Sequence, residues 1–578
     1  MQTLRFTCTA FRSAAVAAAV FGSASLAFAQ RLPGPAALEY AEHEVLVVYK
    51  NAVGDPSRSG APMRIGGRVV QTLAEGRMHR VLLPANVTLL QAIAALNRDP
   101  EVAYAEPNYK LYAHATTPND TYFTDLWGMQ NTGQVYASGV SAGKSGADIH
   151  AVNAWDLTTG AATTIVADID TGIDYNHPDL IDNVWTNPSP GTYNDIHGIK
   201  YNSTYDSTTN TLVPHISGDP FDDNAHGTHT AGTMGATGNN SLGVVGVNWT
   251  VKIIAAKFLD KNGSGYTSDA ISCIDYLNGL KDTWTSGAKD SMGTRLGADI
   301  IVMNNSWGGS GFDQSLKDAI ERANTRGILF VCSAGNASSN NDTTPTYPAS
   351  YGNGNIIVVE ATDANDNQAS FSNYGRTSVN IGAPGVTILS TVPTTYWTSR
   401  GYTGVDPYAY FSGTSMAAPH VSGAIALLHT YKPTLTASQI KTRILKSGDP
   451  VAALWHKTST GRRLNINNAL RAIYPASPTE HTVTLTVKAD KSSYTLNTTA
   501  TITVTAKIGT TVVSALPIAF TITRPDATTY RVTKNTSTLG VVVLAYSTTD
   551  KTGTYKVSAV ASKPYYNSTP TTVSFTVQ

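Results

Sequence analysis

The sequence predicts an α/β domain with a mainly parallel sheet, preceded by a small α+β unit and followed by an all-β unit. Between about residues 117 and 475, continuously apolar runs of strand length alternate with helical stretches, which is typical of parallel strands buried on both faces. From residue 479 onward, Thr, Val and Ser alternate with period two, which is typical of antiparallel sheets. At roughly 100 to 200 residues per domain, a chain of 578 residues has room for several domains.

The composition excludes two classes of protein. Charged residues make up 14% of the chain, hydrophobic residues 41%, and 41 basic residues balance 41 acidic ones. A disordered chain would have fewer apolar residues, and an electrostatic nucleic-acid binder would carry a basic excess. We therefore expect a globular protein with no nucleic-acid partner.

Residues 1–29 predict a secretory signal peptide. Arg5 and Arg12 precede an Ala-rich apolar run, and Ala27-Phe28-Ala29 offers small residues for cleavage before Gln30. The alternative is a membrane-spanning helix, but this stretch is short and broken by serines, whereas a bilayer core is about 30 Å thick. No second apolar run of sufficient length follows, so we expect a secreted, extracellular protein with no membrane span.

The three cysteines exclude a disulfide framework, because Cys8 lies in the predicted signal. An oxidising compartment would permit one bridge between Cys273 and Cys332. Both lie in apolar segments, where a free cysteine behaves as a small hydrophobic residue. We expect two free, buried thiols.

Residues 30–116 predict the small α+β unit. Strand patterns occur at Glu44–Tyr49, His79–Leu83 and Glu101–Glu106, with a helix pattern at Thr88–Leu96. A unit of this size buries little apolar surface by itself, so we expect it to need a partner surface.

Residues 117–475 predict the α/β domain, and residues 479–578 the all-β domain. The α/β strands are expected at Thr164–Ile169, Val251–Ala256, Asp299–Met303, Gly327–Val331 and Ile356–Val359, and the helices at Asp269–Lys281, Gln314–Asn324 and Ser415–Tyr431. Strand patterns at 481–488, 500–506 and 555–560, without a helical period, predict an immunoglobulin-like β-sandwich.

Three polar motifs lie at strand ends or helix starts, where open α/β sheets place their sites. Asp170 follows the first α/β strand pattern, His226 opens a His-Gly-Thr-His run, and Ser415 follows Gly-Thr at the start of a helix pattern. A serine hydroxyl attacks an amide only when an imidazole removes its proton, and a carboxylate must hold that imidazole in one tautomer. We therefore assign Ser415 as nucleophile, His226 as general base and then acid, and Asp170 as orienting carboxylate.

Each motif also has an ordinary explanation when it is read alone. Gly-Thr-Ser opens many helices as a cap. His226 and His229 could begin a zinc site, but no third ligand is evident nearby. The three motifs together, in the order Asp, His, Ser, favour catalysis.

In this order the motifs resemble those of the subtilisin-like serine protease family, peptidase S8. The resemblance covers roughly residues 30–474 and implies a three-layer, subtilisin-like fold with a mainly parallel sheet. It also implies that Asn336, at the end of a buried strand pattern, donates its side-chain amide to the oxyanion, beside the Ser415 backbone N–H.

The same resemblance implies two backbone segments that bind an extended substrate as an added strand. The matching residues are Gly263, Ser264 and Gly265 in one segment and Ser306, Trp307 and Gly308 in the other. The family often has an acidic residue after the oxyanion asparagine, whereas this chain has Ala337. We therefore expect an apolar or aromatic preference before the scissile bond rather than a basic one.

A structural Ca²⁺ site is a further implication of the resemblance. Its matching residues are Asp120, Asp179 and Asn240 through side chains, and Thr237, Leu242 and Val244 through backbone carbonyls. Such an oxygen set suits a hard cation. The loop is one residue longer than in the best-known members, which leaves open which Asn is the ligand. A cluster at Asp219, Asp222 and Asp223 is either a second calcium site or a solvated acidic turn.

The α+β unit resembles the family's inhibitory propeptide, of inhibitor I9 type, which implies an intramolecular inhibitor and folding aid that is cut away between Lys110 and Thr117. The chain is thus expected to be a secreted, calcium-stabilised serine endopeptidase, made as a self-processing preproprotein. We expect it to act as a monomer on polypeptides through an acyl-enzyme. The alternatives are a catalytically silent binding or assembly protein on the same fold, and a peptide ligase that uses the same acyl-enzyme.

Overall fold

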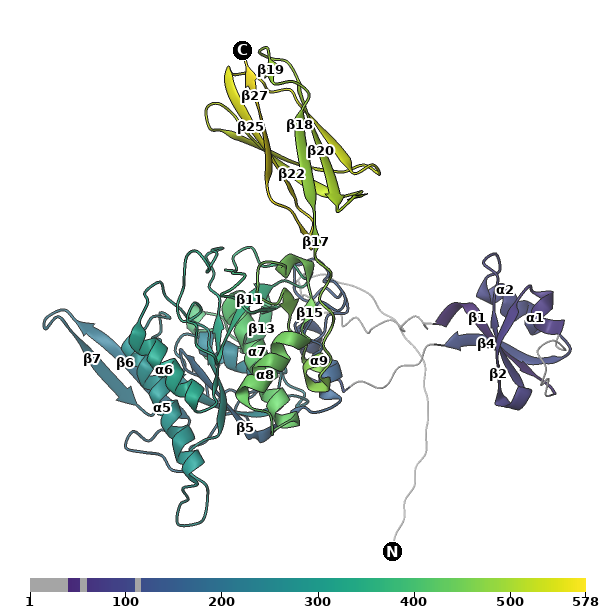
Figure 1. The fold of residues 1–578 in the computed structure, drawn as a ribbon. Coiled ribbons are helices and arrows are strands. Elements are labelled where there is room, and N and C mark those ends of the chain that lie inside the picture. Colours follow the sequence, from purple (N-terminus) through teal and green to yellow (C-terminus); the bar gives the residue numbers. More distant parts are fainter. Residues whose placement is uncertain (1–39, 52–59, 110–115) are drawn as a thin grey trace, which may run out of the picture. The chain divides into compact units, whose positions relative to one another are not determined.

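The computed structural model describes residues 40–51, 60–109 and 116–578 (Figure 1). The expected signal peptide and most of the expected cleavage region lie outside these residues. By its internal contacts the chain divides into two units, residues 1–114 and 115–578. No helix within the described ranges is long and apolar enough to cross a membrane.

The N-terminal unit is a four-stranded antiparallel sheet with two helices. Its strand order is β2-β3-β1-β4, and its elements are β1 (Tyr40–Tyr49), α1 (Gly60–Arg64), β2 (Arg68–Leu73), β3 (Met78–Leu82), α2 (Leu89–Leu96) and β4 (Val102–Tyr109). The helix predicted from Thr88 is present, because Thr88 and Gln91 form a reciprocal capping box at its start. Val45, Val47, Val81 and Leu96 are in the small core between α2 and the sheet.

The second unit is built on a ten-stranded sheet. Its order is β15 (Asp449–Pro450), β16 (Arg462–Arg463), β12 (Ile381–Pro384), β11 (Ile356–Thr362), β10 (Leu329–Ser333), β9 (Ile300–Asn305), β5 (Gly160–Asp170), β8 (Thr250–Lys257), β6 (Gly198–Asp206) and β7 (Thr211–Ser217). Neighbours from β16 to β6 are parallel, and only the two outer pairs are antiparallel. The expectation of a mainly parallel sheet is therefore confirmed.

Helices cover both faces of this sheet, which makes three layers (Figure 1). One face packs on α3 (Ala151–Trp155), α4 (His226–Gly235), α7 (Thr414–Tyr431), α8 (Ala437–Ser447) and α9 (Ile466–Arg471), and the other on α5 (Thr267–Ser286) and α6 (Gln314–Thr325). Within β5, Val166 packs in the apolar core on the α7 side of the sheet, and Ala167 and Ile169 pack in the core on the side of α5 and α6. The continuously apolar strands follow from this burial on both faces.

Two of the differences from the expected elements have a clear physical cause. Residues 198–217, which carried no expected secondary structure, form the β6–β7 hairpin at one edge of the sheet. The residues of its outer strand, β7, are nearly all exposed and do not alternate between buried and exposed positions. Hydrophobic periodicity therefore does not reveal this strand. Helix α5 extends beyond Lys281 to Ser286, because Gly287, with φ of 75°, forms its C-cap.

Both cysteines outside the expected signal are free and buried, as predicted, Cys273 in α5 and Cys332 in β10. Burial raises the pKa of both thiols above the usual range.

Residues 481–577 form two larger sheets that share one apolar core. One contains β18 (Thr484–Ala489), β20 (Ala500–Ile508), β21 (Thr511–Val512) and β24 (Val541–Tyr546), and the other β19 (Ser493–Tyr494), β27 (Thr571–Val577), β25 (Gly553–Ala561), β22 (Pro517–Thr523) and β23 (Thr529–Asn535). Short strands β17 (His481–Thr482) and β26 (Tyr566–Asn567) pair separately. The all-β character is clear, and the immunoglobulin-like topology stays a prediction.

Candidate active site

Asp170 and His226, which are far apart in the sequence, are hydrogen-bonded in the structure. Asp170 ends β5, His226 begins α4, and His226 Nδ1 lies 2.7 Å from Asp170 Oδ1. The Asp170 side chain is fully buried, whereas 27% of the His226 side chain is exposed. The Thr171 backbone N–H donates to the same Asp170 oxygen at 2.7 Å. Because a carboxylate only accepts, Nδ1 carries the proton, which leaves His226 Nε2 as the acceptor.

The electrostatics of this pair favour the protonated imidazole. Burial lowers the pKa of His226, but the negative charge of Asp170 and its hydrogen bond are the largest opposing contributions, and the pKa of His226 is raised above its usual value. An imidazole held in this way binds a proton readily, as a general base must.

A second carboxylate, that of Asp222, connects the segments that carry Asp170 and His226. Asp222 accepts hydrogen bonds from the hydroxyls of Thr171 at 2.9 Å and Thr228 at 2.6 Å. Thr171 Oγ1 in turn accepts from the Gly227 backbone N–H at 2.8 Å. The residue after Asp170 and the first turn of α4 are therefore joined through Asp222, a connection that sequence reasoning missed.

The neighbouring acidic residues, Asp219 and Asp223, also bind protein groups. Asp223 pairs with the ammonium group of Lys257 at 2.8 Å, and Asp219 accepts from the Tyr175 hydroxyl at 2.9 Å. Lys257 is 1% exposed and also donates to the carbonyl oxygen of Thr171. The structure thus shows hydrogen bonds and an ion pair to protein groups at this cluster, and the second calcium site stays a prediction.

Ser415 lies in the first turn of α7 and lines a pocket together with His226. A pocket of about 390 Å³ is lined by His226, Asn336, Gly413 and Ser415 among others. Ser415 Oγ donates to the carbonyl oxygen of Ser306 at 3.0 Å, and Ser306 Oγ donates to that of Ser415 at 2.9 Å. The hydroxyl is thus not directed at His226 here. Catalytic hydrogen bonds of this kind often form only with substrate bound.

The side-chain amide of Asn336 is oriented by Thr414. Asn336 Oδ1 accepts from both the backbone N–H and the hydroxyl of Thr414, each at 2.9 Å. With the oxygen held in this way, the amide NH₂ group is left to donate elsewhere. Asn336 and Ser415 also line a second pocket together.

The two predicted substrate segments line one pocket of about 660 Å³. Its walls include Gly263, Ser264 and Gly265 on one side and Ser306, Trp307 and Gly308 on the other. The aromatic rings of Phe258 and Trp307 pack edge to face beneath it, with ring centroids 4.9 Å apart. The structure therefore brings all six residues to one groove that also reaches His226.

A neighbouring pocket of about 340 Å³ lies between Ser306 and Asn336 and has no charged residue in its lining. Tyr347 lines both this pocket and the groove. Its backbone exchanges two hydrogen bonds of 2.8 Å with Gly309, which holds it beside the substrate segment. The sequence around Tyr347 carries no motif, so only the fold reveals this residue.

The expected calcium residues also lie close together. Asp179 Oδ1 accepts from the Asn240 amide at 2.8 Å, and Asp179 Oδ2 accepts from the Val244 backbone N–H at 2.9 Å. Asp120 Oδ2 accepts from the Asn239 backbone N–H at 2.7 Å, and Asp120 Oδ1 is buried without a hydrogen-bond partner among the described residues.

Burial shifts the ionisation of both carboxyl groups. Burial, with the charge of Asp120 as a smaller contribution, raises the pKa of Asp179 to about 6. Burial also raises the pKa of Asp120. Two partly desolvated carboxylates in one loop region, one with an unpartnered oxygen, fit a bound cation. No group of three or more His, Cys, Asp or Glu side chains placed to hold a metal occurs in the part of the chain that the structure describes.

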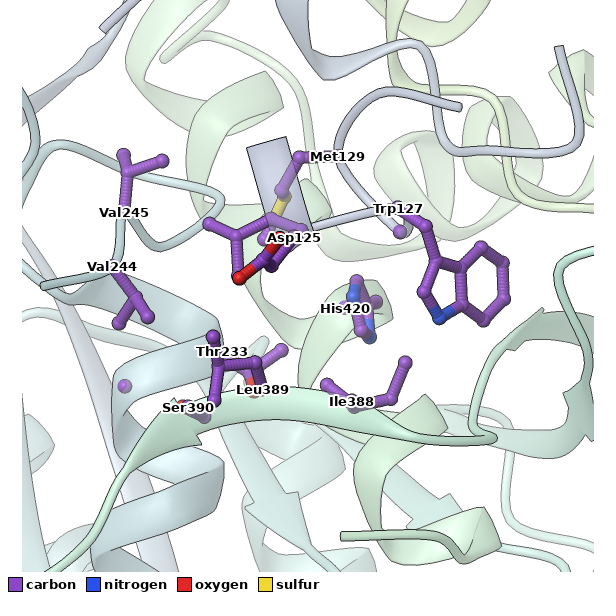
Figure 2. A pocket seen from close by; sticks show the side chains of 13 residues that line it. Asp125, Trp127, Met129, Thr233, Val244, Val245, Ile388, Leu389, Ser390 and His420 are labelled. Carbon is purple, nitrogen blue, oxygen red and sulfur yellow. The ribbon is translucent and has the colours of Figure 1, made fainter. Parts of the chain in front are cut away.

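A small buried cavity beside the site is shown in Figure 2. It lies between the segment Asp125–Met129, α4, the strand β13 (Ile388–Thr391) and His420 of α7. Its volume of about 10 Å³ is near the minimum for a single water molecule. Burial lowers the pKa of His420 to about 4, and the ring hydrogen-bonds to the Met416 carbonyl at 2.9 Å. His420 is therefore a neutral, packed residue of α7.

His229, which could have begun a zinc site, instead contacts the Ile388 and Ala409 carbonyls.

Comparisons with known proteins agree with this geometry. The family model of the subtilase family matches residues 161–471, and that of the fervidolysin N-terminal prodomain matches residues 27–108. The chain is 38% identical over 391 residues to the thermophilic serine proteinase of Bacillus sp. (strain AK1), covering 67% of this chain and 78% of that protein. It is 34% identical over 348 residues to thermitase of Thermoactinomyces vulgaris, covering 60% and 96%.

It is also 33% identical over 433 residues to an extracellular protease of Xanthomonas campestris pv. campestris, covering 73% of this chain and 67% of that protein. The resemblance seen in the motifs is thereby confirmed, as is the N-terminal prodomain. The chain belongs to the subtilase family and is a serine-type endopeptidase with an N-terminal prodomain.

Proposed function

We propose that the protein hydrolyses peptide bonds through a triad of Asp170, His226 and Ser415. The observation that carries this proposal is the 2.7 Å hydrogen bond between His226 Nδ1 and Asp170 Oδ1, in a pocket that Ser415 also lines. In the neutral imidazole, this hydrogen bond keeps the proton on Nδ1 and leaves Nε2 free to accept the serine proton.

The proposed reaction passes through an acyl-enzyme on Ser415. Ser415 Oγ attacks the substrate carbonyl carbon as its proton moves to His226 Nε2. The C–N bond then breaks, and His226 donates that proton to the leaving amine, which leaves an ester on Ser415. A water molecule attacks this ester as His226 Nε2 takes a proton from it. The bond between the acyl carbon and Ser415 Oγ then breaks, His226 returns the proton to Oγ, and the acid is released.

The oxyanion that forms in each step needs two donors. The Ser415 backbone N–H, at the positive end of α7, is one candidate, and the side-chain NH₂ of Asn336 is the other. The two hydrogen bonds from Thr414 to Asn336 Oδ1 support this role, because they fix the amide before substrate arrives.

Substrate would bind as an extended strand between Gly263–Gly265 and Ser306–Gly308. The groove that these segments line supports this proposal. The side chain before the scissile bond would enter the uncharged pocket between Ser306 and Asn336, which favours an apolar or aromatic residue over a basic one.

A structural Ca²⁺ ion is proposed at Asp120 and Asp179, with Asn240 and the carbonyls of Thr237, Leu242 and Val244 as further ligands. The unpartnered Asp120 oxygen and the raised pKa of both carboxyls support it. When bound, the ion would neutralise these carboxylates and hold the loop from Thr237 to Val244.

The protein is further proposed to be secreted after removal of residues 1–29, with residues 30–116 acting as inhibitor and folding aid until they are cut away. The catalytic domain would then comprise residues 117–475. Residues 479–578, proposed as an immunoglobulin-like sandwich, would bind substrate or surfaces or aid stability.

The test is covalent labelling of the processed enzyme with a sulfonyl fluoride. We expect one label per chain, on the peptide that contains Ser415, and activity lost in proportion to labelling. Ser412 and Ser422, close by in sequence, serve as internal controls. Label spread over several serines, or full labelling of Ser415 with activity retained, would refute the assignment.

A further inference from the structure

Asp168 is a buried carboxyl to which the proposed reaction gives no role. It lies two residues before Asp170 in β5, so both side chains emerge from the same face of the strand. Asp168 is 1% exposed, and its backbone is paired with Ala255 of β8 on one side and Asn304 of β9 on the other. A carboxyl at such a depth needs hydrogen-bond partners.

One partner comes from the helix that carries His226. Thr230 lies four residues after His226 in α4, so the two residues share one face of that helix. Thr230 Oγ1 lies 2.7 Å from Asp168 Oδ2 and 3.0 Å from the carbonyl oxygen of Gly227. Asp168 is therefore connected to the first turns of α4.

The other partner leads to the helix that carries Ser415. Asn304 Nδ2 donates to Asp168 Oδ1 at 2.9 Å, and Asn304 Oδ1 accepts from the Ser422 hydroxyl of α7 at 2.9 Å. Asn304 Nδ2 also lies 3.2 Å from Ser306 Oγ, which donates to the Ser415 carbonyl oxygen. Asn304 thus links Asp168 to α7 at two points.

We infer that Asp168 is a positioning residue for the triad, which as an un-ionised carboxylic acid joins the helix of His226 and the helix of Ser415 to the strand of Asp170. This inference rests on the proposed function, since it concerns how the same three residues are held in place. Asp168 itself touches none of the reacting atoms.

The hydrogen bonds around Thr230 favour the un-ionised form. A hydroxyl has one proton to donate, yet Thr230 Oγ1 has two oxygen neighbours within 3.0 Å. If Asp168 carries a proton, its O–H donates to Thr230 Oγ1 and the Thr230 hydroxyl donates to the Gly227 carbonyl oxygen. Each of the two contacts is then a hydrogen bond with its own proton. If Asp168 is ionised, one of these contacts lacks a proton.

The electrostatics point the same way. The charged groups that face Asp168 are Asp170 on its own strand and His226 on α4, while Thr230 and Asn304 are neutral. Burial, followed by the negative charge of Asp170, raises the pKa of Asp168 well above its usual range. A neutral Asp168 fixes the two helices without adding a second negative charge beside the imidazole.

The test compares Asp168→Asn with Asp168→Val. Asparagine can accept from Asn304 and donate to Thr230, as the neutral acid does, whereas valine makes neither bond. Each prodomain is removed in trans by wild-type enzyme, which is then separated, and kcat and KM are measured against pH with a chromogenic peptide anilide. Glu360→Gln, at a buried carboxyl of β11, is the matched control.

We expect Asp168→Val to lower kcat about tenfold or more with KM within about twofold, because substrate contacts remain while the triad loses alignment. Asp168→Asn should recover most of this kcat, and its acid limb in kcat/KM should coincide with that of the wild type and of Glu360→Gln. An acid limb displaced to lower pH in Asp168→Asn would show that an ionised Asp168 had raised the His226 pKa, and would overturn the inference. So would a wild-type kcat in Asp168→Val.

If Asp168→Val does not fold, Thr230→Val gives the same test from the helix side. It removes a single hydroxyl and should lower kcat with KM unchanged, and a wild-type kcat there would refute the connection. Ser415→Ala is measured in parallel. If that variant keeps full activity, the proposed function fails. If it is inactive while the Asp168 and Thr230 variants behave as wild type, only this inference fails.

Discussion

At the scale of single residues, the proposed role of His226 as general base predicts that its ionisation limits activity at low pH. The imidazole must be neutral to take the proton of Ser415, and Asp170 raises its pKa above the ordinary value of about 6.5. We therefore expect kcat/KM to rise with pH and to reach half its maximum above pH 6.5. Asp170→Asn should lower kcat by about 10⁴. A wild-type acid limb at or below pH 6.5 would contradict the electrostatic description of this pair.

Asn336 gives a second prediction at this scale. Asn336→Leu should lower kcat about 100- to 1000-fold with little change in KM, the loss known for removing one oxyanion donor from a protease of this family. Asn336→Asp keeps an acceptor for the two Thr414 hydrogen bonds but lacks the NH₂ donor. A similar loss in both variants would identify the donor as the essential group. Full activity in Asn336→Asp would contradict the assignment.

The sequence reveals some of these residues and hides others for a physical reason. Asp170, His226, Asn336 and Ser415 each lie next to small residues at a strand end or helix start, so a short motif marks each of them. Asp222, Lys257 and Tyr347 become part of the site only through contacts with segments distant in the sequence. No local pattern records such contacts.

At the scale of elements, the close approach of α7 to its neighbours depends on Gly423. A Cβ atom placed there would lie 2.6 Å from Cβ of Val247, inside a closely packed core. Gly423→Ala should therefore lower the free energy of unfolding by about 1 to 3 kcal/mol. Gly279→Ala is the matched control in α5, where nothing lies within 4 Å of the added atom, and should stabilise by about 0.5 to 1 kcal/mol. Denaturant titration measures both, and equal effects would contradict the packing argument.

The loop region of Asp120 and Asp179 gives a prediction about calcium removal. The folded-state pKa of Asp179 lies at about 6, above the usual carboxyl value, so the folded state binds more protons than the unfolded state between the two pKa values. Without calcium, stability should therefore fall as the pH rises through this range, because the buried carboxyl ionises.

Excess calcium should remove most of this fall, since the bound ion favours the ionised form, and Asp179→Asn should show neither the fall nor the calcium effect. The measurement is thermal unfolding between pH 4 and 8, with chelator and with calcium. An equal pH dependence with chelator and with calcium would argue against this site.

Most elements of the main sheet are predictable because burial on both faces leaves long apolar runs, as in β8, β9, β10 and β11. The β6–β7 hairpin escapes prediction because Thr211–Ser217 is an exposed edge strand whose backbone pairing, rather than side-chain pattern, defines it. Pro214 within this strand also disfavours its recognition as a strand.

At the scale of the whole molecule, the site exists only where separate parts of the chain meet. Asp170 comes from β5, His226 from α4, Asn336 from the end of β10 and Ser415 from α7. The order of the domains along the chain follows from composition and periodicity alone. The contacts that align the four side chains require the completed sheet, and they include the Asp168 network.

We propose that one hydroxyl, that of Ser415, performs both proteolysis and removal of the prodomain. The most direct measurement compares the full-length chain with Ser415→Ala by digestion of a denatured protein and by mass spectrometry of both chains. We expect the wild type to digest the substrate and lose its N-terminal prodomain, while Ser415→Ala does neither and stays full length. If neither chain cleaves anything after the prodomain has been removed in trans, or if Ser415→Ala cleaves like the wild type, Ser415 is not the nucleophile of both reactions.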